Sequence, residues 1–195
     1  MNESIFNCGF PLNSLGMTHR FAAEVVQPGD LCIDATAGRG RDTAFLCGLV
    51  GDTGRVLAFD IQPEAVAATQ ALLAGKGFTQ GEVHCDSHHN MRQYAAPGTV
   101  RCIMFNFGWL PGGDHACYTR PETSIPAIEA GLELLMPDGL MSLCIYSGGV
   151  NGYGERDAIL RYVETIDPTR YTVITTRFAN RTGDPPIPVF IIKRG

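Results

Sequence analysis

Short apolar runs alternate with longer amphipathic segments along most of the chain. In residues 14–27 the apolar positions recur at helical intervals and stop at Pro28-Gly29-Asp30, after which a short apolar run follows. The same alternation continues toward the C-terminus. It predicts helices at residues 14–27, 41–50, 63–76, 122–136 and 154–166, and strands at residues 31–35, 55–59, 82–85, 100–106, 140–146, 171–177 and 189–193.

Strands separated by helix-length segments favour a parallel sheet with right-handed crossover helices. We therefore expect a doubly wound α/β fold of the Rossmann-like type, with a mostly parallel seven-stranded sheet. Only a loop rich in Pro and Gly (NRTGDPPIP) separates the last two strands, so they can pair as a hairpin and place an antiparallel strand at the C-terminal end. In such sheets the ligand site lies beyond the carboxyl ends of the strands.

The composition fits one ordinary globular domain, residues 1–195, because 45% of the residues are hydrophobic and 18% are charged. No basic segment followed by an apolar run opens the chain, and no apolar run approaches the ~20 residues of a membrane span. We expect a cytoplasmic protein without membrane attachment. Seven cysteines occur singly, without C-x-x-C spacing, and are expected to be reduced and mostly in the core: Cys8, Cys32, Cys47, Cys85, Cys102, Cys117 and Cys144.

The net charge of −5 argues against a protein that binds nucleic acid through overall positive charge, but it leaves a local basic face open. Of the 15 basic residues only Lys76 and Lys193 are lysine. Arginine is the better partner for phosphates and stacked bases, although a compositional bias explains its excess equally well.

The loop DATAGRGRDT, residues 34–43, lies between the first strand and the next helix. Glycines at positions 38 and 40 allow the backbone to approach a ligand, and the helix N-terminus offers unpaired N–H groups. A plain tight turn is the alternative. The residues expected to bind the ligand are Asp34, Thr36, Gly38, Gly40, Asp42 and Thr43.

Asp60 ends the second predicted strand, where a carboxylate can accept hydrogen bonds from both hydroxyls of a ribose. Ile61 and Gln62 follow it and are expected to lie against the same ligand. An adenosine-type ligand fits this pattern. Asp34 stands four residues before the first glycine, where it can reach an amino group; S-adenosylmethionine has an amino group there and NAD has a pyrophosphate, so we expect S-adenosylmethionine.

The segment CDSHHN, residues 85–90, ends the third predicted strand. Asp86, Ser87 and His88 are candidates to meet the edge of the adenine. A solvated loop is the alternative reading for the histidines, and no third ligand at suitable spacing supports a metal site.

The segment NFGWLPGGDH, residues 106–115, follows the fourth predicted strand and is similar to the Asp/Asn-Pro-Pro-Tyr/Phe loop of amino-methyltransferases. An amine must aim its lone pair at the sulfonium methyl group, and the Asn106 amide oxygen can hold the amine N–H groups. Trp109 can stack on a base, with Phe107 and Gly108 beside it in the substrate pocket. A turn with a tryptophan in the core is the alternative.

The sulfonium is already a good leaving group, so positioning supplies most of the catalysis and no metal is needed. The reacting amine must be neutral. Asp114, His115 and Tyr146 are open alternatives for the group that removes its proton. Asn106, Trp109 and Asp114 are thus the expected catalytic residues.

These segments together resemble the small bacterial proteins described as rRNA methylases, a class I methyltransferase family that includes the YtqB-like (MnmM) tRNA methyltransferases. The resemblance covers nearly the whole chain. It rests on D-A-T-x-G-x-G-x-D-T at residues 34–43, F-D-I-Q at 59–62, D-x-H-x-N at 86–90, N-x-G-W-L-P-x-G-D at 106–114, and then Pro121, Thr123 and Ala127-Ile128.

The resemblance implies methylation of the amine of 5-aminomethyl-(2-thio)uridine at the wobble position of tRNA, in an anticodon loop whose bases are already single-stranded. Arg120, Arg156 and Arg181 are candidate phosphate contacts, and Tyr146 is a candidate substrate contact. A homodimer is a further possibility. The alternatives are methylation of rRNA or a small molecule with the same cofactor, and a non-catalytic nucleotide-binding domain.

The chain departs from the family pattern in one segment. Where Y-H-G-H-x-x-G-x-x-E is expected it has YSGGVNGYGE, residues 146–155, with Ser147 and Gly149 in place of the histidines. Tyr146, Gly152 and Glu155 remain. If the histidines of the family remove a proton or contact tRNA, the substrate or the mechanism differs in this chain.

Overall fold

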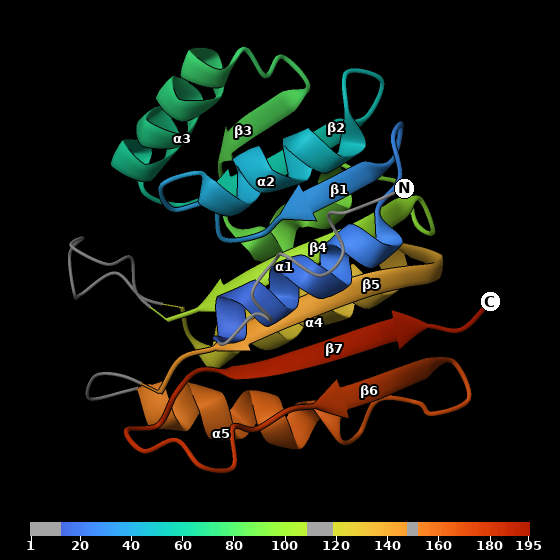
Figure 1. Ribbon diagram of the computed structural model, residues 1–195. Helices are drawn as coiled ribbons and strands as arrows, with labels where there is room; N and C mark the ends of the chain where they lie inside the picture. The colour runs from blue at the N-terminus through green and yellow to red at the C-terminus, as the bar shows by residue number, and fades with distance from the viewer. Residues whose placement is uncertain (1–12, 109–118, 148–151) are drawn as a thin grey trace, which may run out of the picture.

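The computed structural model describes residues 13–108, 119–147 and 152–195, which contain a seven-stranded sheet (Figure 1). The strand order is β3-β2-β1-β4-β5-β7-β6, and every neighbouring pair is parallel except those of β7, which runs antiparallel to β5 and β6. The strands are β1 (Leu31–Asp34), β2 (Arg55–Asp60), β3 (Gly81–Cys85), β4 (Val100–Phe107), β5 (Leu135–Ile145), β6 (Tyr171–Thr175) and β7 (Ile187–Lys193).

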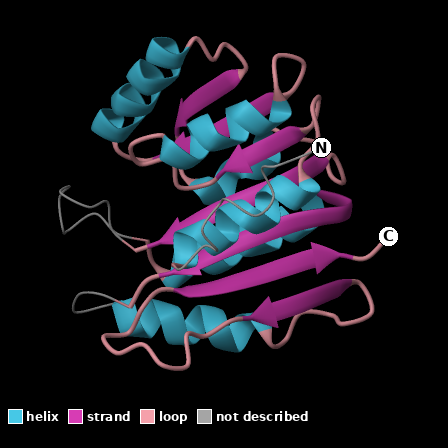
Figure 2. Ribbon diagram, in the orientation of Figure 1, coloured by secondary structure: helices cyan, strands magenta, loops and turns pink. Residues whose placement is uncertain are grey.

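Helices cover both faces of the sheet (Figure 2). They are α1 (Ser14–Val25), α2 (Arg41–Val50), α3 (Pro63–Lys76), α4 (Pro121–Leu134) and α5 (Gly152–Val163), with a short 3-10 helix η1 (His88–Gln93) after β3. The side chain of Asn13 caps α1 by accepting a hydrogen bond from Gly16 N–H. Proline opens both α3 and α4, where its missing N–H costs no helical hydrogen bond.

Two apolar cores lie on opposite faces of the sheet because successive strand residues point to opposite sides. Ile103 and Phe105 of β4 pack with α4, α5 and η1, whereas Cys102 and Met104 pack with α1, α2 and α3. Strands buried on both faces explain the continuous apolar runs in the sequence.

The expected architecture is confirmed, including the hairpin of the last two strands, Tyr171–Thr175 and Ile187–Lys193. Many boundaries shift by one to three residues, and the start of the fifth strand shifts furthest. The helix was expected to continue to residue 136 and the next strand to begin at residue 140, but α4 ends at Leu134 and β5 begins at Leu135. Leu135 pairs with Val100 before the register shifts, and Asp138 turns the chain with φ 59°.

The order of the strands defines where a ligand can bind. The chain moves outward from β1 through β2 to β3 and then returns to β4 on the other side of β1. The loops after β1 and β4 therefore leave in opposite directions and open a crevice at the carboxyl ends of these two strands. None of the helices among the described residues is long and apolar enough to cross a membrane.

Candidate active site

A cavity of about 810 Å³ opens at this crevice. It collects residues from the carboxyl ends of β1 to β5, from α1 and from the start of α4. Its lining consists of Leu15, Ala35, Thr36, Ala37, Gly38, Arg39, Arg41, Asp42, Phe59, Asp60, Ile61, Gln62, Asp86, Ser87, His88, Asn106, Phe107, Gly108, Thr119, Arg120, Thr123 and Tyr146. Most of the residues expected from the sequence to bind ligand are in this set.

The loop between β1 and α2 brings backbone to the cavity. Gly38 and Gly40 both have positive φ, 53° and 75°, which glycine adopts without strain. Gly38 lines the cavity, whereas Gly40 does not. A Cβ on Gly40 would lie 2.9 Å from Cγ2 of Thr69, so this glycine allows the loop to pack against α3.

The Asp34 carboxyl group, expected from the sequence to contact a ligand amino group, is not part of the cavity lining. Its side chain is fully buried, and it accepts hydrogen bonds from Thr43 Oγ1 at 2.6 Å and from Thr36 N–H at 3.2 Å. Burial, with the nearby Asp42 carboxylate, raises the pKa of Asp34 to about 7. The hydrogen bonds of Asp34 with Thr36 and Thr43 therefore stabilise the loop between β1 and α2.

The Asp60 carboxylate anchors two segments at the end of β2. Its Oδ2 accepts from Gly38 N–H and its Oδ1 accepts from Gln62 N–H, both at 2.9 Å. Two carboxylate oxygens offer about four lone-pair sites, so lone pairs remain for the hydroxyls of a ligand. Beside it the side chain of Ile61 is 56% exposed and offers an apolar surface to the cavity.

The segment after β3 forms a third wall. Asp86 accepts from Asn90 Nδ2 and Tyr94 Oη, both at 2.8 Å, and these two hydrogen bonds hold the pKa of its carboxyl below the usual range. His88 is 9% exposed and packs edge-on against Phe105 and Phe107. Burial lowers the pKa of His88 to about 4, so its imidazole is neutral at pH 7.

Asn106 lies near the end of β4 and is held at two points. Its backbone N–H donates to Thr36 Oγ1, and its side-chain Nδ2 donates to Asp42 Oδ2, both at 2.7 Å. Since a carboxylate only accepts hydrogen bonds, the Nδ2 group faces Asp42 and the amide oxygen is left for a ligand.

Gly108 and Thr119, which flank residues 109–118, are hydrogen-bonded to each other at the cavity wall. Gly108 N–H donates to Thr119 Oγ1 at 2.8 Å, and Thr119 N–H donates to the Gly108 carbonyl at 3.1 Å. The buried carboxylate of Glu155 on α5 accepts from Thr119 Oγ1 at 2.8 Å and from Ser124 Oγ at 2.6 Å. Trp109, Asp114, His115 and Gly149 lie outside the described residues.

Tyr146 follows β5 and its side chain is 39% exposed. Burial of the rest, together with Cys144, raises the pKa of Tyr146, so its hydroxyl stays protonated at neutral pH. A neutral phenol donates a hydrogen bond but is a poor proton acceptor. Ser147, which replaces an expected histidine, is 6% exposed and its Oγ has no hydrogen-bond partner among the described residues.

The arginines expected to contact phosphate occupy different places. Arg120 lines the cavity, whereas Arg156 and Arg181 do not. Arg156 pairs with Asp157 at 2.8 Å and stacks on Tyr153, and Arg181 stacks on Phe178.

Several cavity residues were not expected from the sequence. Leu15 and Arg41 line the cavity, and His19 of α1 binds Asp42 from outside it, with 2.7 Å between Nε2 and Oδ1. The sequence of α1 places His19 in an ordinary amphipathic helix, and only the packing of α1 beside α2 brings it to Asp42. Arg41 follows the second glycine of the loop and begins α2. Its position at this helix N-terminus was the sequence feature that could have predicted its place at the cavity.

Five cysteines lie within the described residues. Cys32, Cys47, Cys102 and Cys144 are free and buried, as expected, but Cys85 is exposed at the end of β3, where the strand is at the edge of the sheet. Cys8 and Cys117 lie outside the described residues. Within the described ranges, no three His, Cys, Asp or Glu side chains gather where they could hold a metal ion.

The sheet order, the glycine loop after β1 and the carboxylate after β2 define a class I S-adenosylmethionine-dependent methyltransferase. A family model described as "Putative rRNA methylase" matches residues 56–192. The chain belongs to this rRNA methylase family, and it is a methyltransferase.

Relatives and solved structures agree with this assignment. The chain is 31% identical to the chloroplastic tRNA (mnm(5)s(2)U34)-methyltransferase of Arabidopsis thaliana, in an alignment that covers 91% of this chain and 68% of the relative. A crystal structure described as an rRNA methylase from Clostridium thermocellum is 42% identical, with a TM-score of 0.91 and coverage of 93% of this chain and 97% of that one. A Streptococcus mutans methyltransferase in complex with SAH is 31% identical, with a TM-score of 0.85 and coverage of 93% and 98%.

Proposed function

We propose that this methyltransferase transfers a methyl group from S-adenosylmethionine to the primary amine of 5-aminomethyl-(2-thio)uridine at the wobble position of tRNA. The observation that carries the proposal is the orientation of Asn106. Its Nδ2 is committed to Asp42, so its amide oxygen can accept an N–H of an incoming amine at the cavity. The relative from Arabidopsis, named for the same modified uridine, supports this choice of acceptor.

The residues for the methyl donor lie on one side of the cavity. Asp60 has lone pairs for the ribose hydroxyls, Ile61 offers an apolar face for the adenine, and Asp86 and Ser87 stand at the adenine edge. The backbone at Thr36 and Gly38 allows close approach of the methionine part. The donor supplies a methyl group on a positively charged sulfur, which is already a good leaving group.

The acceptor side is formed by the end of β4 and its neighbours. Asn106 orients the amine, and Phe107, Gly108 and Tyr146 contact the base, with Trp109 and Asp114 proposed to complete this side. The Tyr146 hydroxyl acts as a hydrogen-bond donor because its pKa is raised. Orientation of a neutral amine toward the methyl group supplies most of the rate acceleration, since no nucleophile has to be created.

An RNA partner also fits the arginines at the cavity, Arg39, Arg41 and Arg120, which can contact phosphates beside the target base. We further propose that residues 1–195 act as one domain and that the protein works in the cytoplasm. We also propose a homodimer, which sedimentation can test.

Incubation with labelled S-adenosylmethionine tests the proposal directly. Label is expected to enter tRNA that carries the aminomethyl group and to spare tRNA prepared without it. Label in rRNA alone would replace this proposal with an rRNA methyltransferase. Cofactor binding without transfer to any RNA would indicate a non-catalytic domain, and binding of NAD in place of S-adenosylmethionine would overturn the cofactor as well.

A further inference from the structure

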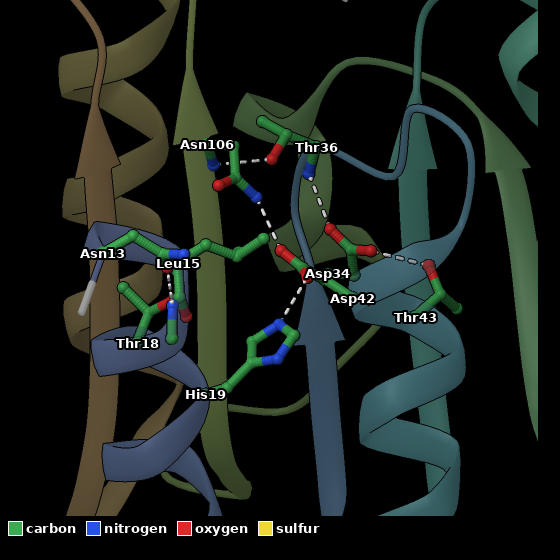
Figure 3. A network of polar contacts seen from close by, with 10 residues as sticks. Asn13, Leu15, Thr18, His19, Asp34, Thr36, Asp42, Thr43 and Asn106 are labelled. Atoms are coloured by element: carbon green, nitrogen blue, oxygen red, sulfur yellow. Dashed lines mark hydrogen bonds and ion pairs between the residues drawn. The ribbon is translucent and has the colours of Figure 1, made fainter. Parts of the chain in front are cut away.

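A chain of three polar side chains connects the N-terminal helix to the proposed amine site (Figure 3). His19 of α1 contacts Asp42 of α2, with 2.7 Å between Nε2 and Oδ1. The other oxygen of Asp42, Oδ2, accepts from Asn106 Nδ2 of β4, also at 2.7 Å. Three elements that are far apart in sequence thus meet at a single carboxylate.

The chemistry of Asp42 determines the orientation of both partners. An ionised carboxylate has no proton to donate, so the hydrogen bond with His19 requires a proton on the imidazole Nε2. The same argument places the Asn106 Nδ2 group, and not its oxygen, against Asp42. Asp42 is 6% exposed, so little water can replace either donor.

The imidazole of His19 is itself held in place. It stacks on Phe45 of α2 with 3.9 Å between the ring centroids and 4° between the planes. This stack fixes the ring so that Nε2 points at Asp42. The ring therefore contributes both an apolar contact and a hydrogen bond, and the two contributions can be separated by substitution.

We propose that His19 is a positioning residue for methyl transfer, because it fixes Asp42 and thereby the direction of the Asn106 amide oxygen. The inference rests on the proposed role of Asn106 in holding the amine. Without His19, Oδ1 of Asp42 lacks this donor, and the carboxylate can turn toward other donors and release the Asn106 amide. A small error in aiming the amine at the methyl group lowers the rate of transfer and leaves binding of the methyl donor unchanged.

Two substitutions separate the hydrogen bond from the stack. His19→Phe keeps a ring against Phe45 but has no donor, whereas His19→Gln keeps an N–H donor but has no ring. The expected result for His19→Phe is a fall in kcat of about tenfold, the lower end for a lost hydrogen bond to a charged group, with the cofactor Kd unchanged. His19→Gln is expected to keep most of the activity. Glu24→Gln, an exposed change on the same helix, is the control.

A double substitution tests whether His19 acts through Asn106. Adding His19→Phe to Asn106→Ala should lower kcat no further, since the group that His19 positions is already absent. A purely structural role predicts the reverse pattern: His19→Phe is active, His19→Gln is impaired, and the losses from His19→Phe and Asn106→Ala combine fully. Either that pattern or full activity in both single variants would overturn the inference.

The side-chain amide signals of Asn106 in a nitrogen–proton NMR spectrum give a readout that needs no substrate. We expect them to shift in His19→Phe and to remain near their wild-type positions in His19→Gln. Unchanged signals in both variants would overturn the inference even if the enzyme is active. An inactive wild-type protein whose Asn106 signals respond as expected would instead overturn the proposed substrate and leave the role of His19 in place.

Discussion

At the scale of single residues, the cavity is shaped by three carboxylates that form hydrogen bonds within the protein. Asp60 accepts two backbone N–H groups, Asp86 accepts two side-chain donors, and Asp42 joins His19 to Asn106. Each carboxylate is therefore held in position before a ligand binds, which lowers the entropic cost of ordering these side chains on binding. Their different positions predict different effects of substitution.

Asp60→Ala and Asn106→Ala should separate cofactor binding from turnover. Loss of hydrogen bonds to a charged group costs about 1.5–3 kcal/mol, so Asp60→Ala should weaken S-adenosylmethionine binding by roughly tenfold or more in calorimetry. Asn106→Ala should leave this Kd near the wild-type value and lower single-turnover transfer by up to about a hundredfold. Equal loss of binding and turnover in the two variants would refute this division.

Asp34 makes the stability of the fold depend on pH. Its pKa is raised from 3.8 to about 7 in the folded state, so protonated Asp34 favours folding below pH 4 and this contribution is lost as the pH rises toward 7. Asp34→Asn cannot titrate. From pH 4 to 7 the free energy of unfolding of the wild type should fall relative to this variant, by about 1.4 kcal/mol for each unit of the pKa shift.

Urea unfolding at several pH values measures this difference, with Asp52→Asn, an exposed change, as the control. If the free energies of unfolding of Asp34→Asn and the wild type differed by a constant amount over the whole pH range, Asp34 would have an ordinary pKa in the fold.

At the scale of elements, α4 and α5 hold the acceptor side of the cavity together. Glu155 of α5 accepts from Ser124 of α4 and from Thr119, which is in turn bonded to Gly108 at the end of β4. A buried carboxylate with two hydroxyl donors and a pKa raised by burial is costly to disturb. The link between these elements is therefore expected to support both stability and turnover.

Glu155→Ala should lower the free energy of unfolding by about 2 kcal/mol, because it removes the acceptor of the buried Ser124 hydroxyl and the shorter of two acceptor contacts of the half-buried Thr119 hydroxyl. Glu155→Gln keeps one acceptor oxygen, so its free energy of unfolding should fall by less. Chemical denaturation measures both, and Glu129→Ala, an exposed change on α4, provides the matched control. A loss in Glu155→Ala no larger than that of the control would contradict the role of this link.

Most elements could be predicted because each strand is a short apolar run with turn residues at its ends. The start of β5 could not be predicted, because the sequence Pro137-Asp138-Gly139 is typical of a loop. In the structure the strand begins before it, and Leu135 pairs with β4 ahead of a register shift. The places of Asp60 and Asn106 followed from their positions at the ends of apolar runs, and the structure has them at the carboxyl ends of β2 and β4. The contact of His19 with Asp42 depends on how α1 packs beside α2, and the inward orientation of Asp34 depends on Thr43, so neither was visible in the local sequence.

At the scale of the whole molecule, a chain of net charge −5 must bind an anionic partner through local contacts. Arg39, Arg41 and Arg120 are gathered at the cavity by two different loops. Each phosphate contact contributes to the salt dependence of RNA binding in proportion to the counterions it releases.

Arg41→Ala and Arg120→Ala should each weaken tRNA binding and reduce the slope of log K against log salt by about 0.7–1. Arg161→Ala, an exposed change on α5, should leave the slope unchanged. Titration of tRNA at several salt concentrations gives the slopes. Identical slopes for all three variants would place the RNA contact elsewhere on the surface.

Nucleoside analysis of cellular tRNA by mass spectrometry shows whether the methyl group goes to the aminomethyl nitrogen of the wobble uridine. If this nitrogen is the acceptor, cells that lack the gene should accumulate the 5-aminomethyl nucleoside and lose the 5-methylaminomethyl form, and the wild-type gene but not Asn106→Ala should restore the methylated form. An unchanged amount of the methylated nucleoside in tRNA, in cells with no other enzyme for this step, would contradict this assignment.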